Sequence, residues 1–176
     1  MTASPRVRLR PATLDDADLL DAWAASPKKR GEFNDFGEPP HRSFREMLAE
    51  GPLLGENHGE LLVERIEDDR PIGTIGWHAV MNGPLKSRCW NFGISLIPDA
   101  RGHGYGVEAQ RLVADHLFAT TDANRVEAST DVDNRAEQRA LEKAGFTREG
   151  VLRGAQFRAG AYHDLVVYAR LRNDPA

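Results

Sequence analysis

The sequence predicts a single mixed α+β domain built on a six- to seven-stranded, mostly antiparallel sheet. Alternating apolar segments separated by short turns occur near both ends of the chain, as in antiparallel hairpins. In the middle, a strand, a glycine-rich loop, a helix and another strand follow one another, as in a β-α-β crossover. The length of 176 residues suits one domain, so we assign residues 1–176 to it.

The composition is ordinary for a soluble protein, with 40% hydrophobic and 28% charged residues. No apolar run approaches the roughly 18 residues of a membrane span, and the polar N-terminus predicts no secretory signal. The net charge of −4 argues against a general nucleic-acid-binding protein. Cys89 is the one cysteine and cannot form an internal disulfide, so we expect a cytoplasmic protein. No metal site is predicted.

The first elements follow from alternation and helix-start signals. Residues 7–10 alternate and predict a strand. Thr13 followed by acidic residues is typical of a helix start, and apolar residues at helical spacing extend this helix to about residue 25. Residues 26–40 contain glycines and a Pro-Pro pair, which predict an irregular segment. A short helix is expected at 43–50.

Three strands are expected next, at residues 60–67, 72–81 and 87–97. Turn signals separate the first two of these strands at 68–71 and the last two at 82–84.

The crossover and a closing hairpin make up the second half. A helix is expected from about 104 to 119, a strand at 125–130, and a helix at 135–144 that Gly145 ends. Two final strands, 146–156 and 162–171, form a hairpin.

The segment Arg101-Gly102-His103-Gly104-Tyr105-Gly106 places glycine at every second position between a strand and a helix. Glycine removes side chains that would block a phosphate and permits turns that aim successive N–H groups at one point. The helix that follows adds unpaired N–H groups and the positive end of its dipole. Because Arg101 adds a full charge, this loop is suited to a pyrophosphate.

Four interpretations of this loop compete: a tight turn for close packing, a dinucleotide-binding loop, a P-loop and an acyl-CoA site. A dinucleotide-binding fold requires Gly-x-Gly-x-x-Gly near the start of repeated βαβ units. Asp131 stands at about the distance expected for its ribose-binding acid, but the glycine spacing differs and only one crossover is predicted. A P-loop requires Gly-Lys-Ser/Thr, which does not occur here. The tight turn and the acyl-CoA site both stay open on the loop alone.

Several segments together resemble the GNAT superfamily of acyltransferases. Arg101-x-x-Gly104-x-Gly106 matches the family's Arg/Gln-x-x-Gly-x-Gly/Ala motif, and residues 90–98 resemble the strand before it. Residues 134–146, from Asn134 to Lys143-Ala-Gly-Phe146, are similar to the second family signature. Glu149-Gly150 and Gly160-x-Tyr-x-Asp164 are similar to the closing hairpin of the RimJ/RimL type, which acetylates N-termini of ribosomal proteins. The similarity covers essentially the whole chain.

The resemblance implies the GNAT fold and an N-acyltransferase that uses acetyl-CoA between two parting strands. Asn134 would bond the pantetheine arm or a nearby backbone group; from the residues alone, an N-cap with Glu137 as its capping-box partner is an equal interpretation. The cofactor contacts that the resemblance implies are backbone groups of Ile94, Leu96 and Ile97 for pantetheine, and Arg101, Gly102, His103, Gly104, Tyr105, Gly106 and Val107 for the pyrophosphate.

The implied reaction is direct attack of an amine on the thioester in a ternary complex. The N–H of Leu96, or of its neighbour, is the candidate donor to the developing oxyanion. The chain departs from its relatives at Leu141, where many have a tyrosine, and at Glu137, where the RimJ/RimL type often has serine. Glu137 and His78 are candidate bases, although a surface glutamate on a helix and a satisfied histidine in a sheet are the commoner roles.

The acceptor is expected to be an amine bound by the first helix, the 26–40 segment and the outer strands. A protein N-terminal α-amine is the leading hypothesis, a small-molecule amine such as an antibiotic or metabolite is the alternative, and a non-catalytic acyl-CoA sensor is the third. Homodimerisation is common in the family, but nothing in the sequence demonstrates it. Candidate acceptor-lining residues, each equally suited to the core, are Trp23, Phe33, Phe36, Trp77 and Trp90.

Overall fold

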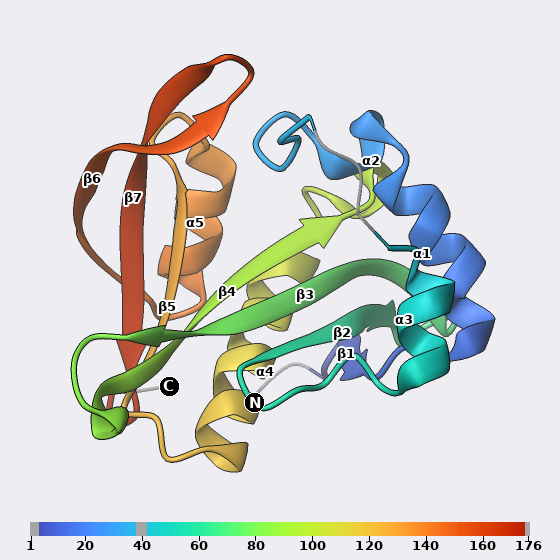
Figure 1. The fold of residues 1–176 in the computed structure, drawn as a ribbon, viewed down its shortest axis with the longest axis horizontal. Helices are drawn as coiled ribbons and strands as arrows, with labels where there is room; N and C mark the ends of the chain where they lie inside the picture. The colour runs from blue at the N-terminus through green and yellow to red at the C-terminus, as the bar shows by residue number, and fades with distance from the viewer. Residues whose placement is uncertain (1–3, 38–41, 175–176) are drawn as a thin grey trace.

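The computed structural model describes residues 4–37 and 42–174 and contains one seven-stranded sheet. Its strand order is β1-β2-β3-β4-β5-β7-β6 (Figure 1). Only β4 and β5 pair in parallel, and the other neighbours are antiparallel. The predicted α+β class, with a mostly antiparallel sheet and a central β-α-β crossover, is confirmed.

The strands are β1 (Val7–Arg10), β2 (His58–Arg65), β3 (Arg70–Met81), β4 (Arg88–Leu96), β5 (Arg125–Asp131), β6 (Thr147–Arg158) and β7 (Ala161–Leu171). The helices are α1 (Ala17–Ala24), α2 (Pro27–Arg30), α3 (Phe44–Glu50), α4 (Tyr105–Thr120) and α5 (Arg135–Lys143).

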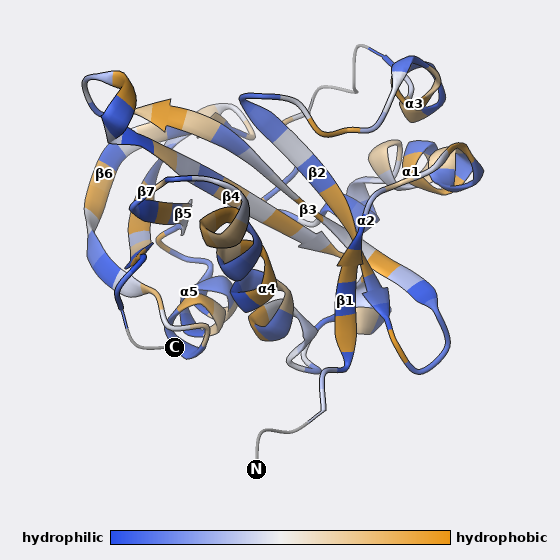
Figure 2. Ribbon diagram, turned by 90° about the horizontal axis from the view of Figure 1, so that it is seen from below, coloured by the Kyte–Doolittle hydropathy of each residue, from blue (hydrophilic) through white to orange (hydrophobic). Residues whose placement is uncertain are grey.

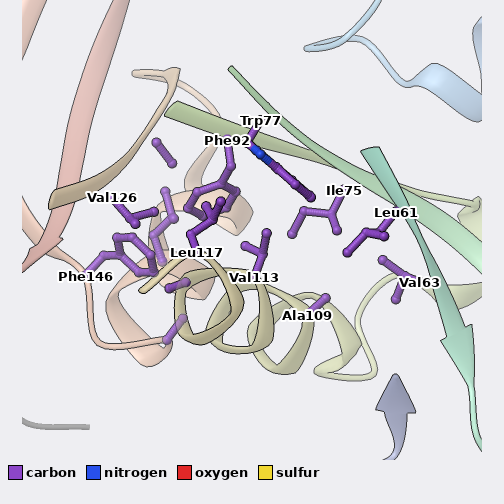
Figure 3. Close-up of a cluster of buried hydrophobic side chains, with 14 of the residues drawn as sticks. Leu61, Val63, Ile75, Trp77, Phe92, Ala109, Val113, Leu117, Val126 and Phe146 are labelled. Atoms are coloured by element: carbon purple, nitrogen blue, oxygen red, sulfur yellow. The ribbon is translucent and has the colours of Figure 1, made fainter. Parts of the chain in front are cut away.

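The helices cover both faces of the sheet. Helices α4 and α5 lie on one face and α1 and α3 on the other (Figure 2). On the α4 face, Trp77 and Phe92 pack with Val113 and Leu117 in the larger core cluster (Figure 3). Burial of each such side chain stabilises the fold by about 1.5–3 kcal/mol. A smaller cluster packs Leu20 and other residues of α1 and α3 against the opposite face.

Local signals account for the helix ends. Ser43 caps α3 by accepting a hydrogen bond from the Glu46 N–H, while the Glu46 carboxylate accepts from the Ser43 N–H, which completes a capping box. After the C-terminal end of helix α5, Gly145 adopts a φ of 90°, a left-handed conformation that favours glycine at this position.

The structure differs from the expected elements mainly before residue 50. Residues 27–30 form the short helix α2, where an irregular segment was expected, because Ser26 and Pro27 supply an N-terminal boundary and Pro at the first turn. The first helix begins with a 3-10 turn, Leu14–Asp16, before α1. The part of the 26–40 segment beyond residue 37 lies outside the described residues.

Neither a membrane span nor a metal cluster occurs in the described part of the chain. No helix there is long and apolar enough to cross a membrane. No three His, Cys, Asp or Glu side chains within residues 4–37 and 42–174 gather in a way that could hold a metal ion.

Candidate active site

The sheet opens between β4 and β5. The two strands pair only at Trp90↔Val126 and Asn91↔Glu127, and no further pairs follow toward the C-terminal end of β4. Figure 1 shows the two halves of the sheet diverging from this point. A cavity of about 630 Å³, hereafter the β4–β5 cleft, occupies the opening. This volume lies within the range of sites that enclose most of a small ligand, about 300–1,000 Å³.

Near its C-terminal end, β4 directs alternate backbone groups away from β3 and toward this cleft. The N–H of Ile97 donates to the carbonyl of Ile72 on β3. Because peptide groups alternate along an antiparallel strand, those of Leu96 and Ile94 point the other way, into the opening. The Ile94 carbonyl accepts from Asn34 Nδ2 at 3.3 Å. The N–H groups of Ile94 and Leu96 are therefore oriented toward the cleft.

The glycine loop lies where the cleft meets the start of α4. Gly102 and Gly104 have φ values of 80° and 83°, which side chains other than glycine rarely adopt. Gly104 occupies the N-cap position, so the first N–H groups of the helix have no side-chain cap. Gly102, Gly104, Gly106 and Val107 line the cleft, as the pyrophosphate prediction requires.

His103 and Tyr105 belong to the same loop but are not among the residues that line the cleft. Their contacts are with Arg6, which donates to the His103 carbonyl at 2.9 Å and stacks 5.2 Å from the Tyr105 ring centroid. Arg6 also pairs with Glu108. The Tyr105 ring thus packs against Arg6, and a role of either residue in cofactor binding stays a prediction.

Arg101 lines the cleft but uses its guanidinium within the protein. Nε donates to the Leu96 carbonyl at 2.9 Å and Nη2 donates to the Lys29 carbonyl at 2.8 Å. Arg101 thus ties the end of β4 to α2 while its charge stays at the cleft. The charged residues that line the cleft are Arg30, Arg101, Arg139 and Lys143, against Glu32 and Glu137. This excess of cations favours an anionic ligand, although the whole chain is acidic.

Asn134 caps α5 at the edge of the cleft. Its side-chain oxygen accepts from the Glu137 N–H at 3.3 Å, and Nδ2 donates to the Thr130 hydroxyl at 3.0 Å. The N-cap interpretation is therefore confirmed. The reciprocal half of the capping box is not made, because the Glu137 carboxylate turns to Gln110 instead.

Glu137 is a half-buried acid in the wall of the cleft. Gln110 Nε2 donates to Glu137 Oε1 at 2.7 Å, from a glutamine with 0% exposure. Burial disfavours the charged form and raises the pKa of Glu137 to about 7, although the hydrogen bond from Gln110 opposes this shift. A carboxyl with this pKa exchanges its proton near neutral pH. Leu141, at the position of the family tyrosine, has 0% exposure and belongs to the core.

The other candidates divide between cavity walls and core. Phe33 lines the β4–β5 cleft, and Trp23 lines a second cavity of about 210 Å³ on the α1 face of the sheet. Trp77 is buried against α4, and Trp90 donates from Nε1 to the Thr121 hydroxyl at 3.2 Å. Neither tryptophan lines either cavity, so their positions favour a core role. His78 and Phe36 are exposed and line neither cavity.

Two groups of residues were missed in the sequence. Glu60 lines the second cavity, on the same strand face as the buried Leu62. The sequence feature that could have indicated Glu60 is an acidic residue two positions from an apolar residue in a predicted strand, on the same strand face. Asp131, with 3% exposure, pairs with Arg158, which also donates to the Glu32 carbonyl at 2.8 Å. No local pattern relates Asp131 to Arg158, because 27 residues separate them.

Comparisons with known proteins agree with this geometry. The chain matches YoaA of Bacillus subtilis, named an uncharacterized N-acetyltransferase, with 35% identity over 107 residues. The match covers 61% of this chain and 59% of YoaA, so it spans less than two thirds of that relative.

Two solved structures share the fold at low sequence identity. The ribosomal-protein-S5-alanine acetyltransferase of Vibrio fischeri superposes with a TM-score of 0.77 at 18% identity, covering 98% of this chain and 97% of that one. The spermidine N-acetyltransferase of Vibrio cholerae, in complex with CoA and spermine, gives a TM-score of 0.78 at 19% identity and covers 96% and 97%.

A family model settles the relationship. The model described as the acetyltransferase (GNAT) domain matches residues 6–147, which include β4, the glycine loop and α5. The chain therefore belongs to the GNAT acetyltransferase family.

Proposed function

We propose that the protein transfers an acetyl group from acetyl-CoA to a primary amine, with both substrates bound at once. The observation that carries this proposal is the continuity of the open β4 edge with the glycine loop at the start of α4. In acetyl-CoA the thioester arm leads to the pyrophosphate, so the arm would lie along the open β4 edge and the pyrophosphate at the glycine loop. Acetyl-CoA supplies the activated acetyl group.

The cofactor contacts proposed here use mainly backbone groups. Pantetheine lies along Ile94 and Leu96, and the pyrophosphate accepts from N–H groups in the 102–107 loop. Ile97, the third backbone contact that the resemblance implies, donates its N–H to the Ile72 carbonyl and lines the second cavity, so its position does not support that contact. Arg101 favours the anion by charge. Asn134 offers a polar side chain at the cleft wall, although its amide already caps α5 and bonds Thr130. The cationic lining of the β4–β5 cleft supports an anionic cofactor of this kind.

Two groups of the chain are proposed to serve the chemical step. The Leu96 N–H, or that of Ile94, stabilises negative charge that develops on the thioester oxygen, because a fixed donor needs no reorganisation. Glu137 provides a carboxyl that holds or releases a proton near neutral pH. The exposed position of His78, away from both cavities, offers no support for a role as base.

The acceptor is proposed as a protein N-terminal α-amine or a small-molecule amine. The structural neighbours include proteins named for each kind, an S5-alanine acetyltransferase and a spermidine acetyltransferase. The second cavity favours the small amine, because its volume of about 210 Å³ accommodates only a compact group.

The cofactor proposal is tested by thermal unfolding with acetyl-CoA. Addition of acetyl-CoA should raise the Tm of the wild-type protein, since a ligand that binds only the folded state stabilises it. Gly104→Asp should abolish this rise, because a side chain at a φ of 83° strains the loop and its carboxylate adds negative charge beside the N–H groups that must bind the pyrophosphate. Gly160→Asp is the matched control: its φ of 82° is close to the 83° of Gly104, and it lies in the β6–β7 turn.

Gly160→Asp should keep the full acetyl-CoA response whatever its own Tm. An undiminished response in Gly104→Asp would contradict the loop assignment. Release of free thiol from acetyl-CoA in the presence of amines then separates an enzyme from an acyl-CoA sensor, which would bind without turnover.

A further inference from the structure

The second cavity lies beside the cleft, on the face of the sheet that α1 covers. Its walls include Leu20 and Trp23 of α1, Phe44 of α3, and Thr74 of β3. Ser95, Asn34 and Arg30 line both this cavity and the β4–β5 cleft. A molecule in the second cavity therefore adjoins the open edge of β4, where the acetyl group is proposed to lie.

Among the residues that the structure describes, Glu60 is the only acidic one that lines this cavity. Among the described residues, no cationic side chain lies within ion-pairing distance of its carboxylate. Glu64, four residues later on the same face of β2, instead pairs with both Arg8 and Arg10. Partial removal from water raises the pKa of Glu60, and the nearby Thr74 side chain opposes this shift only in part. Glu60 is half-buried, and a carboxylate partly removed from water with no cation beside it costs the fold free energy, so a functional use is expected.

The sheet connects Glu60 to the cleft through polar side chains. Thr74 pairs with Ser95 across β3 and β4, so their side chains share the face that also carries Glu60. Gly76 lies directly opposite Glu60 on β3 and has no side chain. Even a Cβ added there would stay 3.7 Å from the Glu60 side chain, so β3 does not crowd Glu60 at this position. The row Glu60–Thr74–Ser95 thus runs from the second cavity to the β4 edge.

The two cations of the second cavity leave Glu60 available to a ligand. Arg30 donates to the Ala24 carbonyl and pairs with Asp35 at 2.8 Å. Lys29 lies with Nζ 5.5 Å from the centroid of the Trp23 ring. The ammonium group of a bound amine could therefore pair with the Glu60 carboxylate. A second positive charge on the same ligand would be repelled by Lys29 or Arg30.

We propose that Glu60 binds the ammonium group of a compact monoamine and accepts the proton that this group must lose before attack. The proposal rests on the acetyl-transfer function above and names its acceptor class: a primary amine on a short apolar or aromatic chain, which Trp23, Phe44 and Leu20 would surround.

In this step one N–H proton passes from the ammonium to the Glu60 carboxylate. The free amine nitrogen then forms the C–N bond to the acetyl carbon, and the C–S bond breaks. The second proton released from nitrogen goes to the thiolate, giving free coenzyme A thiol. The reaction therefore yields an amide, a thiol and a protonated Glu60, which returns its proton to water.

The test measures steady-state acetylation by wild type and Glu60→Gln, with tyramine, spermidine and a peptide that begins with alanine as acceptors. We expect tyramine to be the best acceptor by kcat/KM. Glu60→Gln should lower kcat/KM for tyramine by about tenfold or more, the loss typical of a charged hydrogen-bond partner. Its KM for acetyl-CoA and its Tm rise with acetyl-CoA should match the wild type, which excludes a folding defect. Glu60→Asp should recover part of the activity.

Glu56→Gln is the control, because Glu56 is exposed, precedes β2 and lines neither cavity. It should behave as wild type. Wild-type kcat/KM in Glu60→Gln would overturn the role of Glu60 and leave acetyl transfer standing. A preference for spermidine or the peptide would overturn the acceptor class. If the wild type acetylates none of the three amines, acetyl transfer itself fails and this inference fails with it.

Discussion

At the scale of single residues, Glu137 couples the site to the stability of the fold. Its carboxyl lies in the wall of the β4–β5 cleft and bonds Gln110, whose own side-chain oxygen is buried without a partner among the described residues. Burial raises the pKa of Glu137 from 4.5 to about 7. Both the protonated and the ionised form are therefore accessible near neutral pH. Ionisation of Glu137 lowers the stability of the folded protein, because the charged carboxylate is partly removed from water.

This cost predicts a pH-dependent stability. Below pH 4.5 the carboxyl is protonated in both the folded and unfolded states and contributes nothing. Between pH 4.5 and 7 the unfolded state loses its proton first, so the free energy of unfolding falls, and it levels off above pH 7. Glu137→Gln removes this term and should stabilise the apo protein at pH 8 by on the order of 2–3 kcal/mol.

Urea unfolding at pH 4 and pH 8 measures this effect. Glu137→Gln and wild type should differ more at pH 8 than at pH 4. Glu67→Gln, in the exposed turn before β3, should show no such divergence from wild type. An equal difference between Glu137→Gln and wild type at both pH values would show that Glu137 ionises normally.

At the scale of elements, Arg158 joins the last hairpin to the segment after α2. From the end of β6 it pairs with Asp131, donates to the Glu32 carbonyl and lies 5.2 Å from the Phe33 ring centroid. His163 of β7 approaches the same Asp131 carboxylate at 3.3 Å. Figure 1 shows the segment after α2 near the tip of the β6–β7 hairpin. This cluster holds Phe33 at the wall of the cleft.

Replacing Arg158 should loosen that segment and weaken the fold. Arg158→Leu leaves a buried carboxylate without its main partner, which typically costs 3–5 kcal/mol. Urea unfolding should show a loss of about this size, and hydrogen exchange should become faster in peptides that contain residues 31–34. Arg153→Leu, at an exposed position of the same strand, should change neither. Unaltered exchange at 31–34 in Arg158→Leu would contradict the connection.

At the scale of the whole molecule, the sequence predicts the crossover better than the surroundings of the site. Alternation in β4, the glycine loop and the α4 periodicity are local patterns, and all three lie where expected. Predicted strand ends differ by a few residues, as in β2, which begins at His58 rather than Glu60. Strand alternation does not define where pairing begins.

The missed features depend on contacts between distant segments. Gln110 meets Glu137 across 27 residues, and Arg158 meets Glu32 across 126. Trp77 and Trp90 are aromatic like Trp23, but α4 covers the face of β3 and β4 that carries them, whereas Trp23 lies on α1 and lines a cavity on the opposite face. Glu60 has the same residue type and strand face as Glu64, and differs because arginines reach only Glu64. These contacts form only when distant segments come together in the folded chain, so local sequence patterns do not reveal them.

The central claim is that coenzyme A occupies the β4–β5 cleft with its pyrophosphate at the glycine loop. A crystal structure of the protein with coenzyme A tests it most directly. We predict pyrophosphate oxygens within hydrogen-bonding distance, about 2.7–3.2 Å, of N–H groups between Gly102 and Val107, and pantetheine beside Ile94 and Leu96. Coenzyme A bound elsewhere, or with its pyrophosphate away from the 102–107 loop, would contradict the account.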